Sequence, residues 1–107
     1  MNLAKKHCVA CKKGTKGLSS KEAAKLLEEV DGWKISKDKK WLQKSYTFKN
    51  FLSALHFTNK VGAVAEKENH HPDLKLGWGY VKIKLQTHAA GGLHTNDFIL
   101  AAKIDAL

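Results

Sequence analysis

The 107-residue sequence predicts a single α+β domain with the element order α-β-β-α-β-β-α, a four-stranded antiparallel sheet with helices packed on one face. Three observations support this class. The length suffices for one hydrophobic core. Three segments repeat apolar residues every three to four positions, as amphipathic helices do. Four shorter segments read as strands, and the last of them alternates apolar and polar residues, which indicates a sheet covered on one face only.

The first half of the chain predicts a helix and then a hairpin. In "LSSKEAAKLLEEV", Ser19 or Ser20 can cap a helix and apolar residues recur at helical spacing, so we expect a helix over about residues 20–30. Asp31-Gly32 should end it. "WKIS" and "KWLQKSYTF" contain the aromatic and β-branched residues that strands favour, and they flank the lysine-rich turn "KDKK". Together they predict an antiparallel pair of strands.

A long helix is expected after Asn50, which can serve as its N-cap. Spacings of three and four predict its buried face, namely Phe51, Leu55, Thr58, Gly62 and Ala65. The small residues at 62 and 65 indicate that the helix crosses the sheet closely at that end. Pro72 cannot continue a helix and biases the preceding residue away from helical angles, so the helix should end before it.

The remaining segments predict a second hairpin and a terminal helix. A short strand in "DLKL" and a strand over about residues 80–86 are separated by the break "GWG". In the second of these strands, Val81, Ile83 and Leu85 share one face, and polar residues occupy the other. After the glycine-containing turn "AAGGLHT", "NDFILAAKIDAL" predicts the last helix.

Residues 1–17 are predicted to be a flexible N-terminal segment, and residues 18–107 the single folded domain. The segment carries Cys8 and Cys11 as a CxxC pair. A structural zinc site normally needs four ligands, and His7 is too close in sequence to be a convincing third. Two interpretations of the thiols stay open: reduced cysteines in a mobile segment, or a metal or disulfide clip.

The charge is strongly basic but unevenly distributed. The net charge is +9; residues 1–50 hold 13 lysines against 5 acidic residues, and residues 51–107 hold 6 against 5. All 19 basic residues are lysine, so the planar guanidinium fork that reads guanine edges is missing. We interpret the lysines as solvated surface and predict no specific nucleic-acid binding. The sequence has no apolar run that could span a bilayer and no secretory signal, so we expect a cytoplasmic protein without a membrane partner.

Five ionisable residues fall at the predicted ends of elements, where scaffolds commonly hold functional groups: Glu66, His70, His71, His88 and Asp97. Glu66 and His70 are four apart, so if the helix reaches residue 70 they should project from the same side of its last turn. Consecutive histidines tend to point apart, unlike the i, i+4 pairs that hold a metal. No nucleophile or phosphate-loop motif is present. The set therefore indicates general acid–base chemistry by imidazoles.

Each of these residues also has a structural interpretation when it is taken alone. A histidine at a helix terminus can be a polar end residue, and Glu66 can be a solvated helix residue. Asp97, in the first turn of the last helix, can complement the helix dipole, with His94 or Thr95 as the N-cap. Trp78 can be a core or lid residue. Convergence of the set in space is what would favour a catalytic site.

The spacing of the set resembles the signature of the pterin-4a-carbinolamine dehydratases. The pattern runs Glu66, three residues, His70-His71-Pro72, five residues, Trp78, nine residues, His88, eight residues, Asp97. The resemblance covers roughly residues 18–105 and includes "GW" at 32–33 and "THAAGGLHTNDF". One departure concerns residue 94, where histidine replaces the usual Ser or Thr and should weaken the helix cap.

The resemblance implies a 4a-hydroxytetrahydrobiopterin dehydratase, a hydro-lyase that removes water from the pterin-4a-carbinolamine. The product, quinonoid dihydropterin, would return to an aromatic amino acid hydroxylase. The reaction exchanges only protons and water, so no metal and no cofactor are expected, the pterin being the substrate. The predicted order of elements agrees with the fold that the resemblance implies.

The resemblance also implies roles for individual residues. His70 and His88 would transfer protons and His71 would bind and orient the pterin, so the three histidines form the expected catalytic set. The remaining substrate-binding residues would be Pro72, Thr87, Ala89 and Ala90. Glu66, Trp78 and Asp97 would support the site.

Self-association and two other functions belong to the same set of expectations. A sheet with unpaired edges can extend across a two-fold axis, and the resemblance implies a homodimer or a homotetramer. The alternative function is a non-catalytic dimerisation or transcriptional cofactor-like binding module. An RNA-binding sheet ranks last, because the exposed strand face would offer Tyr80 as its only aromatic residue.

Overall fold

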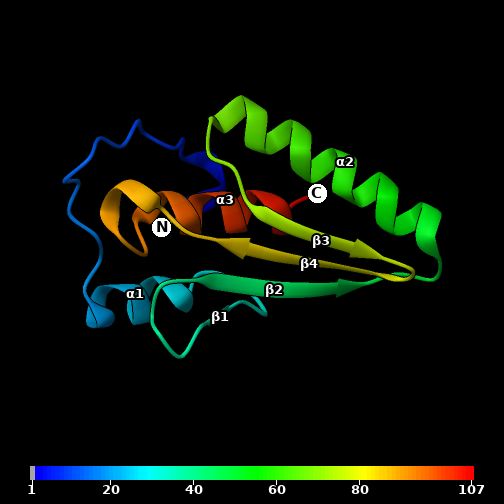
Figure 1. Cartoon of the computed structure of the whole chain (residues 1–107), viewed down its shortest axis with the longest axis horizontal. Coiled ribbons are helices and arrows are strands. Elements are labelled where there is room, and N and C mark those ends of the chain that lie inside the picture. The colour runs from blue at the N-terminus through cyan, green and yellow to red at the C-terminus, as the bar shows by residue number, and fades with distance from the viewer. Residues whose placement is uncertain (1) are drawn as a thin grey trace.

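The computed structural model describes residues 2–107 and confirms the predicted order of elements (Figure 1). The helices are α1 (Ser20–Leu27), α2 (Phe51–Glu68) and α3 (Thr95–Asp105), and the strands are β1 (Lys34–Ile35), β2 (Leu42–Thr47), β3 (Asp73–Gly77) and β4 (Tyr80–Leu85). Two short 3-10 helices, η1 (Leu3–Lys5) and η2 (His88–Ala90), lie outside them. No helix within residues 2–107 is long and apolar enough to cross a membrane.

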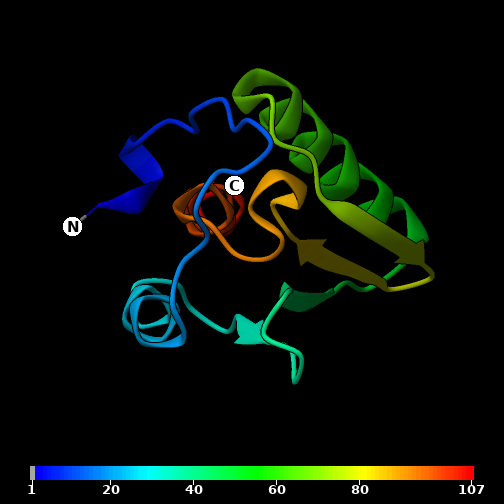
Figure 2. The same ribbon diagram turned by 60° about the vertical axis from the view of Figure 1, so that its left-hand side comes forward.

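The four strands form one antiparallel sheet in the order β1-β2-β4-β3. Because Leu42 pairs with Leu85 and Leu74 with Ile83, the apolar residues of neighbouring strands share one face. The helices lie on that face, as Figure 2 shows. Leu42, Ile83 and Leu85 are completely buried there in one cluster with Phe98 of α3. The predicted α+β class with helices on one face is confirmed.

The first helix begins at the predicted cap and ends earlier than predicted. Ser19 forms a capping box, in which Glu22 N–H donates to Ser19 Oγ at 3.1 Å and Ser19 N–H donates to Glu22 Oε1 at 2.9 Å. The helix ends at Leu27, because the next three amides bond to carbonyls three residues back. This tighter turn brings Val30 into the core, where it is 8% exposed.

The buried face of α2 differs from the predicted one. Ala54, Val61 and Ala65 are buried, whereas Phe51 is 44% exposed and a side chain at Gly62 would meet nothing within 4 Å. The face is set by Phe57, whose ring packs 4.7 Å from the Tyr46 ring and 5.1 Å from the Phe48 ring. Because these aromatic residues anchor the helix to the sheet, α2 is turned by about one residue, roughly 100°, from the expected stripe.

The N-terminal segment is seated on the domain in the structure. Leu3 is 2% exposed and belongs to the main core cluster, and Lys103 Nζ donates to Ala4 O at 2.8 Å. The chain then passes between the ends of α2 and α3, as Figures 1 and 2 show. Flexibility of this segment stays a prediction, but its contacts tie it to α2 and α3.

Candidate active site

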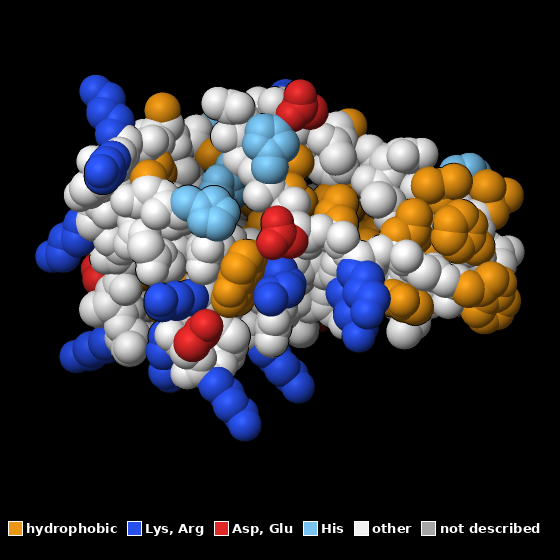
Figure 3. All heavy atoms as spheres, viewed as in Figure 1, with side chains coloured by type: hydrophobic (Ala, Val, Ile, Leu, Met, Phe, Trp, Pro, Cys, Tyr) orange, Lys and Arg blue, Asp and Glu red, His pale blue; other side chains and the backbone are white. Residues whose placement is uncertain are grey.

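One cavity of about 320 Å³ brings the three predicted histidines together. It lies at the end of the molecule where α2 stops and β4 leads into η2, and imidazoles gather on this part of the surface in Figure 3. Its lining residues come from three parts of the chain: Val9, Ala10, Cys11; Asn69, His70, His71; and Gln86, Thr87, His88, Ala89 with Asn96. A larger groove of about 410 Å³ beside α1 has only lysines as ionisable lining residues. The histidine cavity is therefore the candidate site.

The end of α2 sets the positions of the adjacent histidines. Asn69 adopts the left-handed conformation, with φ of 52°, and asparagine tolerates this conformation better than most residues. His70 N–H donates to Ala65 O at 3.2 Å and Asn69 N–H to Glu66 O at 3.2 Å, which is the hydrogen-bond pattern of a Schellman motif. The backbone of His70 is therefore part of the helix terminus.

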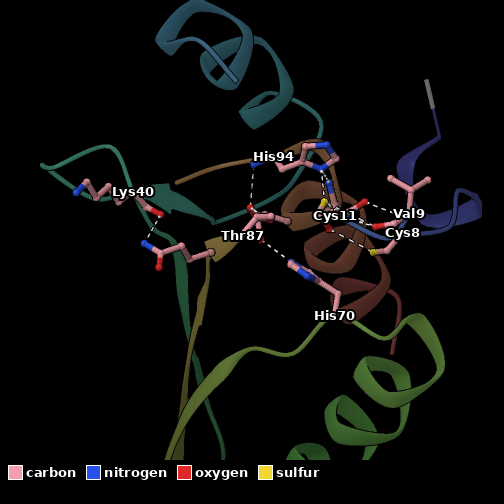
Figure 4. A network of polar contacts seen from close by, with 10 residues as sticks. Cys8, Val9, Cys11, Lys40, His70, Thr87 and His94 are labelled. Atoms are coloured by element: carbon pink, nitrogen blue, oxygen red, sulfur yellow. Dashed lines mark hydrogen bonds and ion pairs between the residues drawn. The ribbon is translucent and has the colours of Figure 1, made fainter. Parts of the chain in front are cut away.

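His70 is held by a completely buried carboxylate. Its Nε2 lies 2.6 Å from Asp97 Oδ1, and Asp97 is 0% exposed. The other carboxylate oxygen accepts from Thr87 Oγ1 at 2.9 Å and from His94 N–H at 3.0 Å. A carboxylate can only accept, so His70 carries its proton on Nε2, and Nδ1 is left as the acceptor. Figure 4 shows the ring of His70 directed toward Thr87 from the chain that follows α2.

A tight loop presents His88 at the mouth of the cavity. Thr87 N–H donates to Gly92 O at 2.8 Å and Gly92 N–H returns a bond to Thr87 O at 3.3 Å, so an antiparallel bridge closes the loop. Gly91 has φ of +68°, a conformation that favours glycine. Thr87 is buried while His88 is exposed, which leaves the imidazole of His88 accessible to a ligand.

Glu66 bonds to His71 and not to His70, the residue with which helical spacing would place it on one side of the helix. Its Oε2 is hydrogen-bonded to Nε2 of His71, and both side chains are more than half exposed. The spacing argument assumed that helical geometry continues to residue 70, but the left-handed turn at Asn69 redirects the chain. His70 thereby turns to Asp97 and His71 folds back over the helix end.

His94 caps α3, as one of the two predicted caps; that this cap is weaker than a Ser or Thr cap stays a prediction. Asn96 N–H donates to His94 Nδ1 at 3.1 Å, and the Asp97 side chain accepts from His94 N–H. Because Nδ1 accepts a bond, His94 is in the tautomer protonated on Nε2. An imidazole nitrogen thus replaces the hydroxyl oxygen of the usual cap.

Five of the predicted site residues do not line the cavity. Glu66 and Asp97 bond to histidines that do line it, whereas Trp78, Pro72 and Ala90 have no such contact in the described part of the chain. Trp78 is 71% exposed in the turn between β3 and β4. Since β3 runs away from the histidines for five residues, Trp78 lies at the far end of the hairpin, about 16 Å along the strand. Pro72 does not line the cavity, and neither does Ala90, which lies against Gly17 instead. Of the residues in the predicted site, Thr87 and Ala89 do line it.

Several lining residues were not predicted. Val9, Ala10 and Cys11 come from the segment that was expected to be flexible, and Asn96 is 2% exposed beneath them. The CxxC pair was the only sequence signal for this segment. Nothing in its local spacing connects residue 9 to residue 96, because the contact joins positions 87 apart.

The environment of the two thiols is unfavourable to the thiolate. Burial, followed by the charges of Glu68 and Asp97, raises the pKa of Cys8 to about 12. Burial and the charge of Asp97 also raise the pKa of Cys11. Among the described residues, no three His, Cys, Asp or Glu side chains are grouped closely enough to hold a metal ion. A metal clip at the CxxC pair therefore receives no support from geometry.

The fold and the cavity define a small α+β protein in which three imidazoles line one cavity. One histidine is oriented by a buried carboxylate, a second is accessible, and a third stands beside the first. The model of the family described as pterin 4 alpha carbinolamine dehydratase matches residues 16–107. The chain belongs to this family.

Relatives and solved structures agree with this membership. The chain is 46% identical over 107 residues to a protein of Halorhodospira halophila, covering 100% of this chain and 98% of the relative, and 45% identical over 106 residues to one of Methylococcus capsulatus, covering 99% and 93%. Both are assigned by name as pterin-4-alpha-carbinolamine dehydratases. The crystal structure of a transcriptional coactivator/pterin dehydratase from Brucella melitensis is similar with a TM-score of 0.81 and 30% identity, covering 85% of this chain and 97% of that one.

A second solved structure shows the fold alone. It is described as a pterin dehydratase-like protein that is a RuBisCO assembly factor in the alpha-carboxysome. Its TM-score is 0.61 at 24% identity, with 70% of this chain and 87% of that chain covered. The fold is thus shared by proteins whose descriptions name different roles.

Proposed function

We propose that the protein dehydrates 4a-hydroxytetrahydrobiopterin to quinonoid dihydropterin by histidine acid–base catalysis. The observation that carries the proposal is the His70–Asp97 pair, which opens onto the same cavity as His71 and His88. Family membership supports pterin carbinolamine dehydration as the reaction. The roles proposed for individual residues are those that the family resemblance implies, and the geometry of this chain supports them.

The reaction requires one proton to be delivered and another to be removed. The bond from carbon 4a to the hydroxyl breaks, the neighbouring ring nitrogen loses its proton, and a carbon–nitrogen double bond forms as water leaves. In the proposal Nδ1 of His70 takes the proton from nitrogen, because Asp97 stabilises the positive charge that develops on the ring. His88 delivers the proton to the leaving hydroxyl. Each proton transfer contributes about a hundred- to ten-thousand-fold to the rate.

His71 has a binding role in the proposal. Its ring is held by Glu66 at the exposed rim of the cavity, so a proton-transfer role is assigned to His70 and His88 only. The pterin is the substrate, and no further cofactor takes part. We place the activity in the cytoplasm, where the product would serve an aromatic amino acid hydroxylase.

Single substitutions of the two proton-transfer histidines test the proposal. His88→Ala and His70→Ala should each lower the rate of dehydration of freshly generated 4a-hydroxytetrahydropterin, followed by stopped-flow absorbance, at least tenfold. His56→Ala is the matched control, since His56 is exposed on α2 and does not line the cavity. Circular dichroism establishes that each variant is folded. Turnover of His88→Ala equal to that of the control would remove His88 from the mechanism.

The alternative is a non-catalytic dimerisation or transcriptional cofactor-like module. The description of the Brucella melitensis protein names a coactivator role beside the dehydratase, but that role concerns that protein. No contact in this site favours the alternative, since a module of this kind has no use for a carboxylate-held imidazole in a cavity. Wild-type protein that recovers a regulator from a pull-down and shows no turnover would support it.

A further inference from the structure

Residues 9–11 of the N-terminal segment form one wall of the histidine cavity, and a buried asparagine holds that wall in place. We infer that Val9, Ala10 and Cys11 contact the bound pterin and that Asn96 is the positioning residue for this segment. The inference rests on the proposed function, since it concerns how the same cavity binds a pterin. The wall lies outside residues 16–107, which the family model matches, so membership of the family does not describe it.

Asn96 binds the segment as a neighbouring strand would. Val9 N–H donates to Asn96 Oδ1 at 3.0 Å, and Asn96 Nδ2 donates to Val9 O at 2.7 Å. The same amide group donates to Cys11 Sγ at 3.4 Å, and the backbone carbonyl of Asn96 accepts from Cys8 Sγ at 3.5 Å. Asn96 is 2% exposed, and within residues 2–107 its side chain bonds only to this segment. Figure 4 shows Cys8, Val9 and Cys11 gathered beside the start of α3.

Glu68 fixes the segment from the other side. This residue is 8% exposed at the end of α2, and its Oε1 accepts from Cys8 N–H at 2.8 Å. Its Oε2 lies 3.0 Å from His7 Nδ1 and 3.8 Å from Lys103 Nζ. Leu3, buried at 2% exposure, anchors the chain further upstream. The segment is thus pinned before, at and after residue 8 by groups that the proposed proton transfers do not use.

The consequence for binding follows from where these contacts hold the chain. Residues 9–11 line the cavity that His70, His71 and His88 also line, and they belong to a separate stretch of chain. A planar ring that reaches the histidines therefore meets an apolar and thiol-bearing surface as well as the imidazoles. Such a surface acts on the ground state and the transition state alike, so it should set KM and leave kcat nearly unchanged.

Two variants test the wall in different ways. Ala10→Trp adds bulk to an exposed lining residue without removing any side-chain hydrogen bond, and Asn96→Ala removes the amide that holds Val9. Ala106→Trp and Asn59→Ala are the matched controls, because both positions are exposed and outside the cavity. The readouts are kcat and KM for dehydration and the Kd of 7,8-dihydrobiopterin, a pterin that lacks the 4a-hydroxyl, measured by protein fluorescence.

We expect Ala10→Trp to raise KM and Kd at least tenfold, and Asn96→Ala to raise them at least threefold. In both variants kcat should stay within about threefold of wild type. The two controls should leave all three constants unchanged. Unchanged KM and Kd in Ala10→Trp would overturn the inference, and so would a fall in kcat without a change in KM. If Asn96→Ala fails to fold, Ala10→Trp decides. Wild-type protein that binds dihydrobiopterin without turnover would overturn the proposed function. The Kd values of the variants would then still show whether residues 9–11 contact the pterin. Wild-type protein that binds no pterin would overturn both.

Discussion

Replacing Asp97 with asparagine should change the tautomer of His70. The free ring nitrogen, Nδ1, would then carry a proton and act as a donor where it now acts as an acceptor. One oxygen of Asp97 accepts from two donors, Thr87 Oγ1 and His94 N–H, and the other accepts from His70 Nε2 alone. An asparagine satisfies the larger number of donors by placing its carbonyl oxygen toward Thr87 and His94. Its NH₂ group then faces His70, which must accept through Nε2 and carry its proton on Nδ1.

The size of the effect follows from the loss of this one acceptor. In the proposed mechanism His70 takes the proton from the pterin nitrogen, and the other tautomer cannot do so. On that mechanism kcat should fall by about a hundred- to ten-thousand-fold. Asparagine has nearly the shape of aspartate, keeps the bonds from Thr87 and His94, and reverses the direction of the bond with His70, but all three bonds lose the charge of the carboxylate. The free energy of unfolding should therefore fall by only about 1–3 kcal/mol.

Two measurements separate this mechanism from general damage. Stopped-flow dehydration gives kcat, and the nitrogen-15 chemical shifts of the imidazoles report which nitrogen of His70 carries the proton. Asp105→Asn is the control, since Asp105 lies on the same helix outside the cavity and bonds to Trp33, Lys44 and Tyr46. We expect the control to lose stability and keep its kcat. Wild-type kcat in Asp97→Asn, or an unaltered His70 tautomer with a large loss of rate, would refute the reasoning.

Three further predictions concern stability, pH and assembly. Asp105→Ala should lower the free energy of unfolding by about 2–3 kcal/mol in urea titrations, because Tyr46 and two other donors lose their partner; a change below about 0.5 kcal/mol would contradict this. Although desolvation raises the pKa of Glu68, the Cys8 amide, His7 and Lys103 lower it further, so the net pKa lies below its usual value. Protonation of Glu68 therefore favours release of the N-terminal segment, which should stay docked above about pH 4.5. As pH falls below that value, the Cys8 amide should lose its protection from hydrogen exchange. Protection that does not depend on pH would argue against this coupling. Leu74 is 38% exposed on the edge strand β3, so Leu74→Lys should reduce the homodimer or homotetramer that we expect in sedimentation experiments; an unaltered oligomer would remove this edge from the interface.

The order of elements could be predicted because its signals are local. Asn50, and Ser19 as one of two candidate serines, were recognised as caps from their own side chains, and each bonds to an amide three residues ahead. The alternation of Val81, Ile83 and Leu85 reports one buried face whatever covers it. Pro72 was sufficient to predict that the long helix ends before it, and α2 stops at Glu68. These features depend on neighbours within a few residues, so the sequence was sufficient for them.

The buried face of α2 and the partners of its last residues could not be predicted in this way. Apolar residues lie on more than one side of α2, and the packing of Phe57 on the sheet decides which side is covered. Helical spacing placed Glu66 and His70 on one side of a helix, but the left-handed residue Asn69 redirects the chain, so His70 bonds to Asp97 and Glu66 bonds to His71. A single turn of backbone therefore redirects the site in a way that spacing does not reveal.

The amino-acid sequence alone determined the fold class, the family resemblance and three histidines that do meet at one cavity. Only the tertiary structure decided what surrounds them. His70 meets a carboxylate 27 positions away, and Val9 meets an amide 87 positions away. Trp78, six positions from Pro72, is carried to the opposite end of a strand. The reason is physical: separation along the chain sets local geometry, whereas the site depends on which surfaces the core brings together.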